Sequence, residues 1–226
     1  MILCCPTYAI LNAQVVDSIG DRTVVDRFVD VGGHELHFHI LKGKASKRNA
    51  TAILFESGGG DDATTWKNML QPVSDATGAT LITYDRAGFG KSGFDTRKHG
   101  ILNEVMGLET GLKKLGFKGD LILVAHSLGG FYATLFAARN RQKVKGAVFI
   151  DANLACFFTD EHFNKNRSEN EGDMKRLEAD KKWGAYYIYA NMEPNVPIAS
   201  KSNFSIQDSG SRYGRGKVPF PRRIGF

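Results

Sequence analysis

Short apolar runs recur along the middle of the chain and predict buried strands. They cover residues 51–55, 80–84, 121–125 and 144–150. Runs of this length, bounded by glycine and polar residues, are typical of strands that are buried on both faces of a parallel sheet. We therefore expect a hydrophobic sheet at the centre of the fold.

The segment ahead of these runs alternates apolar and polar residues and predicts a hairpin. Residues 26–31 and 34–40 lie on either side of a pair of glycines. His37 and His39 fall on one face of the second strand, because side chains repeat every two residues. The residues that alternate with them are apolar: Leu36, Phe38 and Ile40. Two imidazoles on one face could hold a metal ion, but no third ligand stands nearby in the sequence. We therefore expect a solvent-facing strand edge and no metal site.

Stretches with helical periodicity separate the apolar runs. One covers residues 64–76, a second covers 101–115, and a third runs from the 126–130 turn to about Ala138. In the second stretch apolar side chains recur at a spacing of about 3.6 residues: Ile101, Val105, Leu108, Leu112 and Leu115. Strands that alternate with helices in this way predict βαβ units, and hence an α/β fold with a mostly parallel, doubly wound sheet.

This rhythm stops after Asp151 and indicates a change of organisation. Residues 158–183 are polar and charged with a helical pattern, and the residues after them are rich in tyrosine and proline. That composition is typical of an inserted cap rather than of another βα unit. We expect four segments: an N-terminal arm or remnant signal peptide (1–23), an α/β core (24–155), a cap- or lid-like insertion (156–200) and a basic tail (201–226).

The excess of positive charge lies at one end of the chain. The formal net charge is +6, and residues 201–226 hold six Lys or Arg and one acidic residue. Residues 1–200 are therefore close to neutral. A nucleic-acid-binding protein usually carries its charge on a folded face, so we expect a solvated tail and no nucleic-acid partner. No apolar run reaches the length of a membrane span.

The first 13 residues are apolar and uncharged, and they leave two interpretations open. In one they are a clipped signal peptide that ends near Ala13, which implies a secreted or periplasmic protein. In the other they form an apolar arm on a cytoplasmic protein. The basic start of a signal peptide is missing, since the first arginine is Arg22.

One motif between a predicted strand and a predicted helix carries chemistry. Ala125-His126-Ser127-Leu128-Gly129 matches the nucleophile elbow, G-x-S-x-G, with alanine in place of the first glycine. The serine of an elbow occupies a strained turn, so the residues two places away must be small to let strand and helix approach. Such a turn exposes the hydroxyl of Ser127 and directs the N–H of Leu128 toward a developing oxyanion. Ser127 is therefore the predicted nucleophile.

Two glycine-rich loops precede the elbow. Residues 56–60 (ESGGG) follow the first apolar run, and residues 85–92 (DRAGFGKS) follow the second and match D-x-x-G-x-G-x-S. Together with the elbow, these loops resemble the α/β-hydrolase family in its esterase, lipase and epoxide-hydrolase-like branch. The resemblance extends over about residues 24–155.

The resemblance implies an oxyanion hole made of backbone N–H groups. In the family, the loop after the third strand reads His-Gly-x, with a tryptophan nine residues after the histidine. Here Ser57 takes the place of that histidine, and Trp66 follows it by nine residues. The family's donors then correspond to the N–H groups of Gly59 and Leu128. Because the first donor is a backbone group, the change to serine does not remove it.

The resemblance also implies an acid and a histidine base, in the chain order Ser, Asp or Glu, His. Asp151 is the candidate acid, and it can equally be a structural cap of its strand. His162 follows Ser127 but falls in the predicted cap. We therefore expect it to be a surface or cap residue in the first place and the catalytic base only in the second. We expect His126 to be packed rather than catalytic. Residues 217–226 resemble the approach to the family's seventh strand, which implies a chain truncated before that strand.

These features predict a serine hydrolase that cleaves a small ester or related acyl substrate without a metal or an organic cofactor. The rival hypothesis is a non-catalytic hydrolase-fold protein that keeps the elbow but lacks the histidine base. Serine at the elbow argues against dehalogenases and epoxide hydrolases, which use aspartate there. The cysteines (Cys4, Cys5 and Cys156) form no CxxC pair, so they indicate neither a zinc site nor a redox motif.

Overall fold

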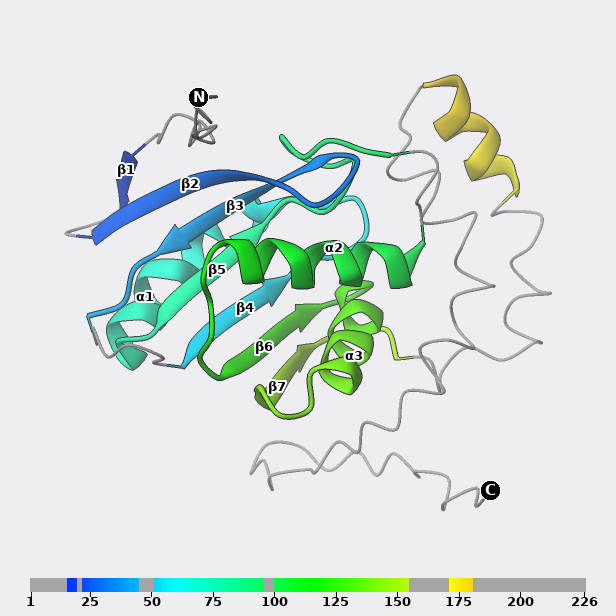
Figure 1. The fold of residues 1–226 in the computed structure, drawn as a ribbon. Coiled ribbons are helices and arrows are strands. Elements are labelled where there is room, and N and C mark those ends of the chain that lie inside the picture. Colours follow the sequence, from blue (N-terminus) through cyan, green and yellow to red (C-terminus); the bar gives the residue numbers. More distant parts are fainter. Residues whose placement is uncertain (1–15, 20–21, 45–50, 96–99, 155–170, 181–226) are drawn as a thin grey trace, which may run out of the picture.

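The computed structural model describes residues 16–19, 22–44, 51–95, 100–154 and 171–180. The described residues form one seven-stranded sheet with helices on both faces (Figure 1). The strands are β1 (Val16–Ile19), β2 (Arg22–Asp30), β3 (Glu35–Leu41), β4 (Ala52–Glu56), β5 (Thr80–Tyr84), β6 (Leu121–His126) and β7 (Val144–Ile150). The helices are the 3-10 turn η1 (Ala63–Trp66), α1 (Lys67–Thr77), α2 (Ile101–Lys114) and α3 (Gly129–Arg139).

The sheet has a parallel half and an antiparallel half. Its strand order is β1-β2-β3-β5-β4-β6-β7. Strands β5, β4, β6 and β7 are parallel, and β3, β2 and β1 are added to them in antiparallel fashion. The α/β fold expected from the sequence is therefore confirmed, with parallel strands at its centre.

The two faces of the sheet bury separate apolar clusters. On the face covered by α1 the buried residues are Val24, Leu41, Ile53, Phe55, Trp66, Leu70 and Leu81. The opposite face carries the larger cluster, which includes Leu54, Ile82, Leu108, Leu123 and Phe136 and packs beneath α2 and α3. These two helices lie side by side over the sheet (Figure 1). Alternate residues of β4 thus face opposite layers, as a sheet buried on both faces requires.

The order of the central strands creates the place where loops can build a site. The chain passes from β4 through α1 to β5 on one face, and then through α2 to β6 on the other side of β4. The loops that follow β4 and β6 therefore leave toward opposite faces of the sheet. A crevice opens at such a switch point, outside the carboxyl ends of the strands, and ligands of open α/β sheets bind there.

Most predicted elements are present, and the differences have local causes. The predicted 64–76 helix begins as a 3-10 turn, a common start of an α-helix, and the carboxylate of Asp62 caps that turn by accepting the N–H of Thr64. Strand β1 was not predicted: the segment that holds it was expected to be an arm, yet it pairs with β2 along its whole length. Four residues are too few for a hydrophobic period to be recognised in the sequence.

Little of the chain beyond β7 can be compared with the prediction. Residues 171–179, inside the predicted cap, are helical. The rest of that cap and the predicted basic tail lie outside the described residues. Within the described part of the chain, no helix combines the length and the apolar character that crossing a membrane requires.

Candidate active site

The turn between β6 and α3 holds Ser127 in a left-handed backbone conformation. Its φ is +47°, a region that residues other than glycine enter only at an energetic cost. The N–H of Ser127 donates to the carbonyl of Ile150 at 3.2 Å, and its carbonyl accepts the N–H groups of Gly130 at 3.0 Å and Asn153 at 2.7 Å. The strained turn expected from the motif is thus present, and the end of β7 holds it in place.

Small residues around Ser127 are required by close backbone contacts. A Cβ atom on Gly129 would lie 2.5 Å from the carbonyl oxygen of Glu56 and 2.7 Å from that of Ser57. A Cβ atom on Gly130 would collide with the carbonyl of Asn153. The start of α3 therefore packs directly against the end of β4 at Gly129 and against the segment after β7 at Gly130, and a side chain at either position would push these segments apart.

The loop after β4 brings Gly59 beside the elbow. A Cβ atom on Gly59 would lie 3.4 Å from the Cδ2 atom of Leu128, so the two residues are neighbours. The spacing of Ser57 and Trp66 also has a structural counterpart: the indole N–H of Trp66 donates to the hydroxyl oxygen of Ser57 at 2.9 Å. The hydroxyl of Ser57 in turn donates to the carbonyl of Asp62 at 3.1 Å. Serine therefore ties this loop to the start of the following helix.

A buried arginine donates hydrogen bonds to the same loop. Arg86, 3% exposed, donates through Nη2 to the carbonyl oxygens of Ser57 and Gly58, at 2.5 Å and 2.9 Å. Its guanidinium lies over the ring of Tyr132, 4.2 Å from the ring centroid. These contacts of Arg86 fix the backbone next to Gly59.

Glu56 lies next to this arginine and is 1% exposed. The hydroxyl of Tyr84 donates to both of its carboxylate oxygens, at 2.9 Å and 2.8 Å. Burial raises the pKa of Glu56 to about 7, although the charge of Arg86 and the hydrogen bond from Tyr84 act in the opposite direction. The loop after β4 therefore starts at a carboxyl group that exchanges its proton near neutral pH.

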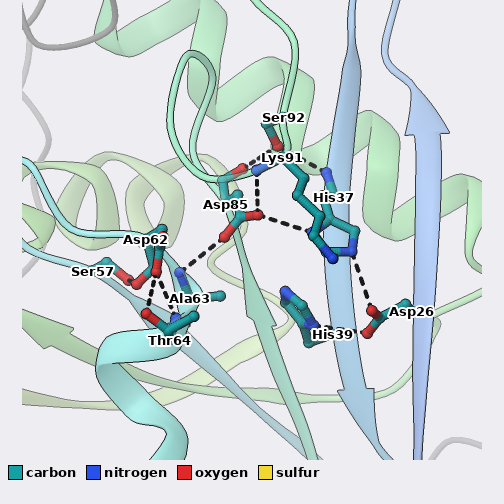
Figure 2. A network of polar contacts seen from close by, with 10 residues as sticks. All are labelled: Asp26, His37, His39, Ser57, Asp62, Ala63, Thr64, Asp85, Lys91 and Ser92. Atoms are coloured by element: carbon teal, nitrogen blue, oxygen red, sulfur yellow. Dashed lines mark hydrogen bonds and ion pairs between the residues drawn. The ribbon is translucent and has the colours of Figure 1, made fainter. Parts of the chain in front are cut away.

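Asp85, the first residue after β5, joins several elements at once (Figure 2). Its carboxylate accepts the N–H of Ala63 and the N–H of Lys91, each at 2.9 Å, and it contacts Nδ1 of His37 at 2.9 Å. Burial opposes ionisation of this carboxyl group, but the hydrogen bonds outweigh burial and lower its pKa. Asp85 thus connects β3, the start of η1 and its own glycine-rich loop.

The prediction of a solvent-facing edge at His37 and His39 is wrong. His37 is completely buried, and its ring stacks on Phe28 with the ring centroids 4.3 Å apart. A third candidate ligand is also present, because Asp26 of β2 contacts both imidazoles. Asp26 pairs with His39 in the β2–β3 register, so a register drawn about the Gly32-Gly33 turn would have found it.

The described residues include the candidate acid but not the histidine that follows it in the chain. Asp151 directly follows β7, is exposed and has a φ of +44°, and the residue before it is bonded to Ser127. His126 is turned toward Asp61, with 3.9 Å between Nδ1 and Oδ2. Among the described residues the hydroxyl of Ser127 has no hydrogen-bond partner, and His162 lies outside them.

A hollow of about 350 Å³ on the surface is not part of this arrangement. Residues 138–143 line it, at the C-terminal end of α3. Ser127 precedes the other end of that helix, which has 11 residues and is therefore about 16 Å long. Ser127 and Leu128 lie instead at the carboxyl end of β6, and Gly59 lies beside Leu128 in the loop after β4.

Comparison with known proteins agrees with the fold described above. The family model described as alpha/beta hydrolase fold matches residues 51–195. The uncharacterized protein YqjL of Bacillus subtilis is 36% identical over 117 residues, which make up 52% of this chain and 45% of that protein. The (lyso)-N-acylphosphatidylethanolamine lipase of Bos taurus is 33% identical over 108 residues, 46% of this chain and 31% of that protein. The chain thus spans less than half the length of these curated relatives.

Among solved structures, the fold is similar to that of Cfl2 from Burkholderia cenocepacia. The TM-score is 0.62 at 17% sequence identity, and the match covers 84% of this chain and 79% of that one. At this level of identity the likeness concerns the fold alone.

Proposed function

This chain belongs to the α/β-hydrolase fold family, and on that premise we propose that it is a serine hydrolase that cleaves a small ester or related acyl substrate. The observation that carries the proposal is the backbone conformation of Ser127. A non-glycine residue with a φ of +47° at the tip of a strand–helix turn is strained, and strain of this kind clusters at active sites. The lipase name of the bovine relative supports acyl-ester chemistry.

In the proposed reaction, the hydroxyl oxygen of Ser127 attacks the substrate carbonyl carbon and its proton passes to a histidine base. The carbonyl oxygen becomes an oxyanion, which accepts hydrogen bonds from the N–H groups of Gly59 and Leu128. Collapse of the tetrahedral intermediate expels the alcohol, which takes the proton from the base. Water then attacks the acyl-enzyme by the same steps and releases the carboxylic acid.

Asp151 is the proposed acid of this system. It follows the strand next to the elbow, and its neighbour Ile150 is hydrogen-bonded to Ser127. An acid in this role orients the histidine and stabilises its protonated form. Its exposure and its left-handed φ of +44° are compatible with a residue that serves the site rather than the core.

A second candidate is a hydrolase-fold protein without turnover. It is favoured by one observation: within the part of the chain that the structure describes, Ser127 has no histidine hydrogen-bonded to its hydroxyl. A serine without an adjacent base is a poor nucleophile. The two candidates make opposite predictions for the reactivity of Ser127.

Labelling with a fluorophosphonate probe, followed by intact mass, separates the two candidates. We expect wild type to take up one probe per chain and Ser127→Ala to take up none. Asp151→Asn should react roughly 10²- to 10⁴-fold more slowly, whereas Asp120→Asn, whose exposed carboxylate pairs with Lys145, should react at the wild-type rate. A folded wild-type protein that takes up no probe would establish the second candidate. Equal rates in both aspartate variants would exclude Asp151 as the acid.

A further inference from the structure

Three side chains with metal-binding atoms meet on the face of the sheet that α1 covers. In the β2–β3 register Asp26 is paired with His39, and Phe28 with His37. Asp26 is therefore opposite one histidine and diagonal to the other, on the same face of the hairpin. Figure 2 shows the two imidazoles on one side of the Asp26 carboxylate. Nothing in the proposed hydrolase chemistry uses these residues.

The distances among the three groups are short. Nε2 of His37 lies 3.4 Å from Oδ2 of Asp26, and Nδ1 of His39 lies 2.7 Å from Oδ1. One ligand atom from each residue can be chosen so that all three lie within 4.8 Å of one another. The cluster is also sheltered, since His37 is fully buried and the side chains of Asp26 and His39 are only 14% and 23% exposed.

The position of the proton on His37 leaves the negative charge of Asp26 without a positive partner on that side. Asp85 is held as a carboxylate by two backbone N–H groups, so the atom that faces it, Nδ1 of His37, must donate. In a neutral imidazole the other nitrogen, Nε2, then carries a lone pair. That lone pair faces a carboxylate oxygen of Asp26 at 3.4 Å, and Nε2 has no hydrogen-bond partner among the described residues. A lone pair against an anion in a buried place calls for a cation between them, either a second proton or a metal ion.

We propose that His37, His39 and Asp26 bind a divalent transition-metal ion of the zinc class. Zinc binds imidazole nitrogen and carboxylate oxygen at about 2.0–2.2 Å in tetrahedral geometry. Neighbouring ligand atoms of such a tetrahedron are about 3.4 Å apart, which is the separation of Nε2 of His37 and Oδ2 of Asp26. Binding replaces the hydrogen bond between Nδ1 of His39 and Asp26. The neutral ring then carries its single proton on Nε2, so that Nδ1 presents a lone pair to the ion.

The hydrogen bond from His37 to Asp85 matches the surroundings of known metal-binding histidines. Such histidines usually donate their second ring nitrogen to a carboxylate, which fixes the ring and raises its basicity. Asp85 holds His37 in that way at 2.9 Å. Three protein ligands leave a fourth position for water. The ion would join β2 to β3 and, through Asp85, to the N–H of Ala63 at the start of η1.

Metal titration of tag-free, chelator-treated protein tests the proposal. We expect calorimetry with Zn²⁺ to give one site per chain, and Co²⁺ to give the visible absorption of a tetrahedral complex. Asp26→Asn and His39→Phe, which alter partly exposed side chains, should each weaken binding more than about tenfold. His34→Gln, outside the cluster, is the matched control and should bind as wild type does. Zn²⁺ should raise the melting temperature of wild type and of this control only.

Two outcomes would overturn the proposal. If folded wild type shows no saturable binding, the cation between His37 and Asp26 is a proton. If wild type and both cluster variants bind equally well, the ion resides elsewhere on the chain. Should one cluster variant fail to fold, the other carries the test, because the two substitutions remove different ligands. None of these readouts depends on hydrolase activity, so the result stands apart from the function proposed above.

Discussion

The two backbone donors of the proposed oxyanion hole are held in different ways. Leu128 belongs to a turn that is fixed by backbone hydrogen bonds and by glycines packed against carbonyl groups. Gly59 belongs to a loop that is fixed by side chains from elsewhere, namely Arg86 and Trp66. The elbow is thus a local device, whereas the glycine loop depends on groups that the fold brings to it. Substitutions should therefore damage the two halves through different physical effects.

The largest expected effect tests the side-chain support of the glycine loop. Arg86→Met removes the donor to two buried carbonyl groups and leaves Glu56 without its nearby positive charge. We expect the free energy of unfolding to fall by roughly 3–5 kcal/mol and fluorophosphonate labelling to slow. Urea denaturation measures the first quantity and the labelling rate the second.

Arg139→Met is the matched control for this substitution. Arg139 makes two hydrogen bonds to Glu109, but the pair is partly exposed. A pair of that kind contributes at most about 1 kcal/mol. Equal losses in the two variants would contradict a special role of Arg86, and the distinction between the two halves of the site would have to be abandoned.

The next effect concerns the pH dependence of the same loop. The pKa of Glu56 is about 7 in the folded protein, so its proton is kept up to about that pH, whereas the unfolded chain loses it near the ordinary pKa of 4.5. Between these values the folded state binds more protons, so the free energy of unfolding falls as pH rises, by about 3 kcal/mol in total. Glu56→Gln keeps an acceptor for Tyr84 and should flatten this slope in denaturation curves recorded from pH 5 to 8. Parallel curves for wild type and variant would disprove it.

The smallest expected effect tests the elbow. Gly129→Ala places a Cβ atom 2.5 Å from the carbonyl oxygen of Glu56, so α3 must shift and the free energy of unfolding should fall by roughly 1–3 kcal/mol. Gly146→Ala is the control, since no atom lies within 4 Å of its added Cβ. That variant should be unchanged or gain up to about 1 kcal/mol. A neutral result for Gly129→Ala would mean that the turn and the glycine loop are not in firm contact.

The parts of the site that the sequence predicted are those whose geometry is local. Ser127, Leu128 and Gly129 lie at the predicted turn, because a strand, a strained turn and a helix follow one another within a few residues. Gly59 was assigned through the resemblance to the α/β-hydrolase family, in which a tryptophan follows at the spacing of Ser57 and Trp66. The structure explains that spacing through a hydrogen bond between the two side chains. Here a spacing in the sequence corresponds directly to a contact in the structure.

The parts that the sequence did not predict depend on contacts between distant residues. His37 was expected to face solvent, because alternation shows which face of a strand a residue is on but not what covers that face. The partners of His37, Asp26 and Asp85, come from another strand and from a loop 48 residues further along. The role of Arg86 was hidden in the same way, since its acceptors stand 29 and 28 residues earlier.

The sequence by itself thus determined the order of strands and helices, the α/β fold and the turn that carries Ser127. These features follow from hydrophobic period and from the need for small residues at close backbone approaches, and both are written in consecutive positions. Only the tertiary structure decided which charges are buried, which ring nitrogen of His37 carries a proton and which side chains hold the glycine loop in place. Those properties arise from the distances between side chains far apart in sequence. Burial then strengthens the interactions between charges, because water no longer screens them.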